Sequence, residues 1–155
     1  MRIDTSKFGV LDVPDKKIIT FSCGILGFEN LTEYVLLNIE ETLPFYWLQA
    51  VENREVALSC MNPFDVMPSY NPEVGLDELE SLMVEDAADL LILTTVVVPA
   101  EPSKATVNLA APIIINAKGG RGAQIVLQNT KYNIRQPIFS DKEGAKYADI
   151  VKKAE

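Results

Sequence analysis

The side chains that most often carry acid–base and nucleophilic chemistry are scarce in this sequence. Its 155 residues include no histidine and two cysteines, so the commonest general base and the commonest metal ligand are both missing. Cys23 and Cys60 match no metal-ligand spacing, so we expect both to be reduced and buried, with a single disulfide as the open alternative. Ser22-Cys23-Gly24 places a thiol before a glycine but offers it no histidine partner. We therefore predict no catalytic residue, no metal site and no cofactor.

Carboxylates are the other candidates for chemistry, and their spacing does not favour it. Glycosidase chemistry needs two carboxylates that face each other across a cleft, whereas Glu40-Glu41 and Asp77-Glu78 are neighbours in sequence. A calcium loop needs acids that alternate around a glycine, and none do. An enzyme that acts on a small molecule through carboxylates is the less favoured alternative. It requires a deep pocket with facing acids whose pKa values are pushed apart.

The formal charge of the chain is −8, and it is unevenly distributed. Residues 28–101 hold 15 acidic side chains and one basic side chain, Arg54, whereas residues 102–155 hold nine basic and four acidic ones. Nucleic-acid affinity comes from Lys and Arg side chains that neutralise phosphates, so we predict no direct nucleic-acid binding. The acidic middle would attract a basic protein surface and accelerate encounter with it. The alternative is that these acids only form a solvating surface.

The elements that must position these residues are mostly short strands. Prolines and glycines recur about every ten residues, a rhythm typical of strands joined by turns. The strongest hairpin signal pairs an aromatic strand over 45–51 with 55–61 across the turn at 52–54. Further strands are expected at 8–13, 17–21, 34–38, 88–99, 106–110, 112–117 and 124–128, with a glycine-rich turn at 119–122.

Helical periodicity is confined to two places. Over residues 77–83 it places four apolar side chains on one face and acids opposite, which predicts a short helix. Residues 62–72, with three prolines, are expected to be irregular. The second segment with helical spacing is residues 139–155, which we expect to form a C-terminal helix or tail. These patterns predict a mostly β, barrel-like or sandwich-like single domain over 1–138 with one or two short helices. The apolar face comprises Leu76, Leu79, Leu82 and Met83.

No segment indicates export or membrane insertion. The first residues include an acid, Asp4, and no apolar run long enough for a signal peptide. The longest apolar stretch, residues 90–100, is shorter than the roughly 20 residues that a membrane span needs. We predict a cytoplasmic protein without membrane contact.

Several further segments share the order of a known family. Residues 18–21 run into Gly24-Ile25-Leu26-Gly27-Phe28-Glu29, where Leu26 stands at a position usually held by proline. Pro44 to Ala50, Asn62-Pro63-Phe64, the strand over 90–99 and residues 108–116 follow. Together, over about residues 3–138, these segments resemble the flagellar assembly factor FliW family.

The resemblance implies a small β-barrel-like fold without enzymatic activity and two protein partners. One is flagellin, held in the cytoplasm before secretion. The other is CsrA, a basic RNA-binding translational repressor that the family antagonises by an allosteric route. Flagellin would draw the factor away from the repressor, so that flagellin synthesis follows its export. The alternative is a secretion chaperone for another helical exported protein, without a repressor partner.

Two groups of residues are the candidates for partner binding. The acids of the predicted helix region would face the basic partner. In the aromatic strand, Phe45 and Trp47 share one face, which is either core or the wall of an apolar groove. The acidic group comprises Glu73, Asp77, Glu78 and Glu80, and the groove group comprises Phe45, Trp47, Asn62 and Phe64.

Overall fold

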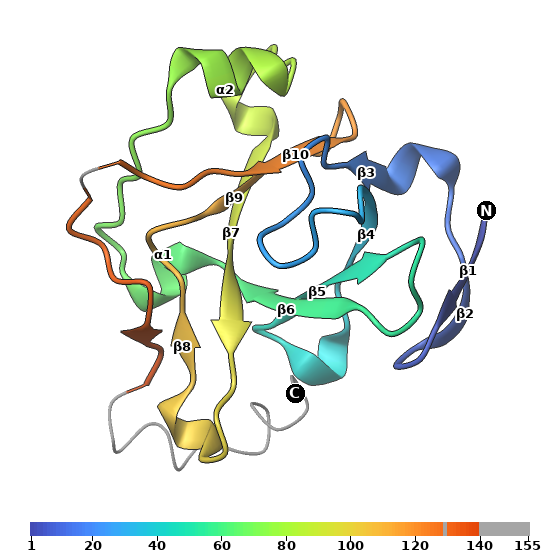
Figure 1. Ribbon diagram of the computed structural model, residues 1–155, viewed down its shortest axis with the longest axis horizontal. Helices are drawn as coiled ribbons and strands as arrows, with labels where there is room; N and C mark the ends of the chain where they lie inside the picture. Colours follow the sequence, from blue (N-terminus) through green and yellow to red (C-terminus); the bar gives the residue numbers. More distant parts are fainter. Residues whose placement is uncertain (129, 140–155) are drawn as a thin grey trace.

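Seven strands close into a barrel in the computed structural model of the chain, which describes residues 1–128 and 130–139 (Figure 1). Neighbouring strands pair antiparallel around the ring, except that β10 meets β3 in parallel. The ring runs β3 (Ile18–Thr20), β4 (Glu33–Leu37), β5 (Tyr46–Ala50), β6 (Ala57–Met61), β7 (Leu90–Val97), β9 (Ile113–Asn116) and β10 (Arg121–Gln124). The mostly β, barrel-like prediction is confirmed.

Strand β7 joins the ring to its extension. Its first residues, Leu90 to Leu93, pair with β9, Thr94 and Thr95 pair with β6, and Val96 and Val97 pair with β8. The remaining strands are β8 (Thr106–Val107), β11 (Gln136–Pro137), which pairs with β8, and the hairpin of β1 (Arg2–Thr5) with β2 (Gly9–Asp12).

The barrel interior is filled by side chains from every strand of the ring except β10. Alternate residues point inward, so Leu48 and Ala50 lie inside while Trp47 lies on the outer face of the same strand. Full burial of a Leu, Ile or Phe side chain contributes roughly 1.5–3 kcal/mol. The buried interior set is Ile19, Phe21, Ile25, Tyr34, Leu48, Ala50, Cys60, Leu93, Ile113 and Ile115.

Two short α-helices lie outside the ring, α1 (Pro63–Val66) and α2 (Leu76–Ser81). The helix α2 was predicted, but its apolar face is only half right. Leu82 is 2% exposed, whereas Leu76 is 76% and Met83 61% exposed. The helix ends at Ser81, and Met83, with a positive φ of 55°, has left the helical conformation. The helix α1 begins in the segment expected to be irregular, because Asn62 Oδ1 accepts the Phe64 N–H at 2.9 Å and caps it.

The expectations for the strand at 124–128, for the glycine-rich turn and for Cys23 need correction. The strand expected at 124–128 is displaced, since β10 occupies Arg121–Gln124 and the glycine-rich segment is partly strand. Gly122 can enter the ladder because it lies flat against the Phe21 ring, where a Cβ would come within 2.5 Å. Cys60 is buried as expected, but Cys23 is exposed, and both thiols are free. Residues 140–155, and with them the predicted C-terminal helix or tail, lie outside the described part of the chain.

Candidate functional site

The helix α2 carries acidic side chains and lies outside the barrel, whose strands pair without it. It begins after Gly75, and Asp77 and Glu78 fill its first turn, where the helix dipole favours negative charge. Its other end is held by Leu82, which packs on the outer face of β9 and β10 against Ile114 and Ile125. The acids are thus displayed in solvent on an element fixed at one end.

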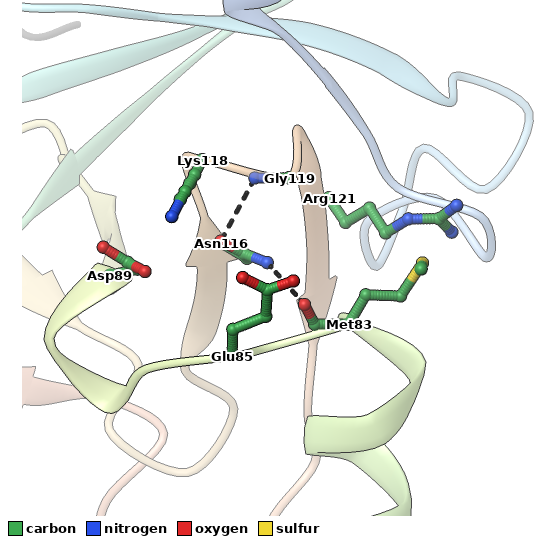
Figure 2. Close-up of a pocket in the computed structure, with 7 residues that line it drawn as sticks. All are labelled: Met83, Glu85, Asp89, Asn116, Lys118, Gly119 and Arg121. Carbon is green, nitrogen blue, oxygen red and sulfur yellow. Dashed lines mark hydrogen bonds between the residues drawn. The ribbon is translucent and has the colours of Figure 1, made fainter.

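Asn116 makes the polar part of this attachment (Figure 2). Its side chain is 3% exposed. Its Nδ2 donates to the carbonyl oxygens of Leu82 at 2.9 Å and Met83 at 3.2 Å, and its Oδ1 accepts the Gly119 N–H at 3.2 Å. One buried amide therefore satisfies the carbonyls that end α2 and the turn between β9 and β10.

Replacing Asn116 with alanine is expected to lower the free energy of unfolding by about 2 kcal/mol, because several buried polar groups lose their partners. The larger local effect should be faster amide hydrogen exchange over residues 76–84. Urea denaturation and hydrogen-exchange mass spectrometry measure the two quantities. Asn108→Ala is the control, since its side chain accepts a hydrogen bond from the nearby Ala110 N–H and, among the described residues, none from α2. Unchanged exchange in α2 would contradict the role of Asn116.

A groove runs beside α2, between residues 69–78 on one side and residues 125–128 and 130–132 on the other. Its volume is about 730 Å³. Figure 1 shows the two segments side by side at the left of the molecule, green and orange. A second cleft of about 380 Å³ continues it, because Ser69, Lys131 and Tyr132 line both. We call the two together the α2 groove.

The walls of the α2 groove differ in character. Glu73 and Glu78 lie on the α2 side, and Lys131 lies on the other. Ile125 and Leu127 are nearly buried beneath it and belong to the cluster that contains Leu82. The groove therefore has an apolar base and charged sides of opposite sign, which suits an amphipathic peptide.

Three aromatic rings support the lower end of the groove. Tyr70 packs edge-to-face on Phe64, with centroids 6.0 Å apart, and on Tyr132, 4.7 Å apart. The Tyr70 hydroxyl donates to the Leu109 carbonyl oxygen at 2.7 Å, and burial raises its pKa. The Asn71 N–H donates to the Tyr132 hydroxyl oxygen at 2.9 Å. These contacts fix the position of both walls.

The structure brings only some of the candidate partner-binding residues together. Glu73 and Glu78 line the groove, and Asp77 and Glu80 are exposed on α2. Phe64 is 40% exposed beside Tyr70. Asn62 lies next to it as the cap of α1.

Phe45 and Trp47 are core residues, so the interpretation of that strand face as a groove wall needs correction. They are 0% and 1% exposed and lie in the same buried cluster as Tyr70. The Trp47 Nε1–H donates to Thr42 Oγ1 at 3.0 Å, and the rings of Phe8 and Trp47 are 5.4 Å apart. Lys7 Nζ lies 4.4 Å from the Trp47 ring centroid. These contacts leave both side chains beneath the surface, where they can support a partner site but not touch a partner.

A separate cleft of about 390 Å³ lies beyond Asn116 (Figure 2). Asp89 and Lys118 stand at one end, Met83 and Arg121 at the other, with Glu85 between them. Its charged groups carry both signs and are mostly exposed.

Among the described residues, Glu29 and Glu52 have clearly lowered pKa values, and both hold loops. Glu52 Oε1 accepts the N–H groups of Thr32 at 2.9 Å and Glu33 at 3.0 Å, and these bonds lower its pKa. Hydrogen bonding by the backbone of Glu29 and Gly27 lowers the pKa of Glu29. Within residues 1–128 and 130–139, no three His, Cys, Asp or Glu side chains form a metal-binding group. In the same residues, no helix is long and apolar enough to cross a bilayer.

The sequence prediction missed Asn116 and the groove wall formed by residues 125–128 and 130–132. Asn116 ends a run of isoleucines, and an asparagine there is also a common turn residue. Residues 124–128 were expected to form a regular strand, and no element was predicted for the residues that follow, so the place of this wall opposite Glu73 could not be foreseen. The apolar alternation of Ile125 and Leu127 was the available signal.

Known proteins match nearly the whole chain. The family model described as FliW protein matches residues 2–138. Two relatives described as flagellar assembly factor FliW, from Thermoanaerobacter pseudethanolicus and Caldanaerobacter subterraneus subsp. tengcongensis, are each 39% identical over 146 residues, which is 94% of this chain and 97% of theirs. A solved structure described as the crystal structure of the flagellar assembly factor FliW has a TM-score of 0.84 and 31% identity, covering 92% of this chain and 99% of that one.

Proposed function

This chain belongs to the FliW family of flagellar assembly factors, and from that premise we propose that it is a cytoplasmic, non-catalytic protein with two protein partners. It binds flagellin before secretion and antagonises the RNA-binding translational repressor CsrA. Flagellin occupancy releases the repressor, so that translation of flagellin follows its export.

The observation that carries this proposal is the acidic α2 beside an apolar groove. Glu73, Asp77, Glu78 and Glu80 are all exposed, and their side chains belong to the 74-residue stretch that has one basic residue. A basic protein gains from such a surface both in encounter rate and in specificity. RNA would be repelled by it, which favours recognition of the repressor itself over capture of its RNA.

Flagellin is assigned to the α2 groove because of its apolar base. A helical segment places apolar side chains at i, i+3 and i+4 on one face, which matches a groove of Ile125, Val126 and Leu127. The exposed Phe64 lies at the lower end of the same surface. Flagellin and the repressor then share Glu73 and Glu78, which border both the groove and α2.

Reversing the charge of two helix acids tests the repressor half of the proposal. The double variant Asp77→Lys and Glu78→Lys is expected to weaken CsrA binding by about tenfold or more at low salt, mainly through a slower association rate, and to reduce the salt dependence. Isothermal calorimetry and stopped-flow kinetics at two salt concentrations measure these changes. Both side chains are exposed, but lysines in the first turn oppose the helix dipole, so the free energy of unfolding should fall by about 1–2 kcal/mol at most.

The matched control is Glu40→Lys with Glu41→Lys, an adjacent exposed pair in the 3₁₀ helix Glu40–Thr42 that connects β4 to β5. Both strands lie away from α2 (Figure 1). The control pair makes the same change in net charge and should affect CsrA binding far less. Equal effects of the two pairs would reject the assignment to α2 in favour of net charge alone. A pull-down from lysate after RNA removal tests the partners: recovery of a different helical exported protein without CsrA would support the secretion-chaperone alternative.

A further inference from the structure

The chain leaves α2 through a residue whose backbone conformation is unfavourable for its type. Met83 has a φ of 55°, in the left-handed region. Its N–H donates to the Glu80 carbonyl oxygen at 2.9 Å, and the Val84 N–H donates to the Leu79 carbonyl oxygen at 3.5 Å. These are the two bonds of a Schellman motif, in which the left-handed position is usually glycine and sometimes asparagine. A methionine there carries the steric cost of its Cβ.

The Met83 side chain makes little contact with the rest of the protein. It is 61% exposed, whereas the preceding Leu82 is 2% exposed. Within the described residues, the cluster around Leu82 takes in Val84 but not Met83. Asn116 holds the motif in place, since its Nδ2 donates to the carbonyl oxygens of both Leu82 and Met83. Glycine or asparagine would end the helix with less strain, so stability does not account for the methionine.

Acidic side chains surround Met83 along the chain. Figure 2 shows its side chain at the same end of the cleft as Arg121, with Glu85 between it and Asp89. An exposed apolar side chain among charged ones has the arrangement of an interface anchor, which a partner buries inside a polar rim. Methionine suits this role because its unbranched side chain adapts to the shape of a pocket. The exposed acids on either side of it are Asp77, Glu78, Glu80, Glu85 and Asp86.

We infer that Met83 is an apolar anchor for the basic partner of α2. Its side chain enters an apolar pocket on that partner, while the acids around it pair with basic side chains. The inference rests on the proposed function, because it takes this partner to be CsrA. The two kinds of contact then have separate effects on binding. The acids accelerate association, whereas the methionine slows dissociation, because it adds buried apolar contact without any charge.

The substitution Met83→Asn tests the anchor, because asparagine accepts the left-handed conformation and only the apolar side chain is lost. It should weaken CsrA binding about tenfold, through faster dissociation at an unchanged association rate and an unchanged salt dependence. Met83→Leu keeps the apolar volume and should hold the affinity within about twofold. Stopped-flow kinetics and isothermal calorimetry on the whole chain measure these changes. The thermal midpoint of Met83→Asn should be no lower than that of the unsubstituted protein.

The matched control is Val10→Asn, which should leave CsrA binding unchanged. Val10 is 64% exposed on β2, which lies away from α2 (Figure 1). Unchanged CsrA affinity in Met83→Asn would overturn the anchor and leave the proposed function intact. An equal loss in Met83→Leu would also overturn it, since the backbone and not the apolar side chain would then set the affinity. Absence of CsrA binding by the unsubstituted protein would overturn the proposed function and the anchor together.

Discussion

Replacing Trp47 with alanine is expected to lower the free energy of unfolding by about 3–5 kcal/mol, the range found for large aromatic side chains truncated in a core. The side chain is 1% exposed, and its Nε1–H bond to Thr42 is buried. Truncation also removes the edge contact with Phe8 and the cation–π contact with Lys7. Circular dichroism in a urea titration measures the loss, since the variant has no tryptophan fluorescence.

The substitution Trp47→Phe separates a core role from a partner contact. It keeps most of the buried apolar volume and loses the hydrogen bond to Thr42, so a loss of roughly 1–2 kcal/mol is expected. Affinity for CsrA and for flagellin should be unchanged, because the indole lies beneath the surface. Reduced partner affinity at unchanged stability would show that Trp47 reaches the partner after all.

Gly24→Ala is expected to lower the free energy of unfolding by roughly 2–4 kcal/mol. Gly24 has a φ of +68°, and a Cβ there would lie 2.6 Å from Glu29 Cα and 2.7 Å from the Glu29 carbonyl oxygen. These are backbone atoms, so no side-chain rotation relieves the overlap. The loop would have to move, and with it the Leu26 N–H that donates to Gln124 of β10 at 2.9 Å.

Gly27→Ala is the matched control for this substitution. Gly27 lies three residues further in the same loop with a φ of +90°, but a Cβ there meets no atom within 4 Å. Gly27→Ala should therefore lower the free energy of unfolding only by the cost of a left-handed backbone at alanine, about 1 kcal/mol. Thermal unfolding of both variants distinguishes the cases: similar losses would mean that the left-handed backbone, and not the contact with Glu29, makes Gly24 necessary.

Residue patterns over short segments correctly predicted the elements that contacts between near neighbours in sequence stabilise. The hairpin of β5 and β6 has apolar residues on both faces of β5 and a polar turn, and it forms as expected. The acids of α2 favour its first turn, and the helix begins within a residue of its predicted start. The barrel class followed from the number and spacing of such strands.

Predictions failed where pairing at long range decides the structure. The run Ile125-Val126-Leu127 has the stronger β propensity, yet the regular ladder forms one segment earlier, since β10 must meet both β9 and β3. Pairing with β9 and packing of Gly122 on Phe21 select the register of β10. The β propensity of single residues does not predict that register. The same limit applies to the site: Glu73 is 58 residues from Lys131 in sequence, and only the fold sets them on facing walls.

The barrel closes through β7 and β9 without any contribution from α2, and this separates two kinds of motion. Opening the ring breaks ladders on which the whole fold depends. Detaching α2 exposes Leu82 together with the faces of Ile114 and Ile125 on which it packs, and frees the bonds of Asn116. The acidic helix can therefore undergo sub-global opening at a small fraction of the total unfolding free energy. A surface built this way can adjust its shape to a ligand while the scaffold beneath it stays intact.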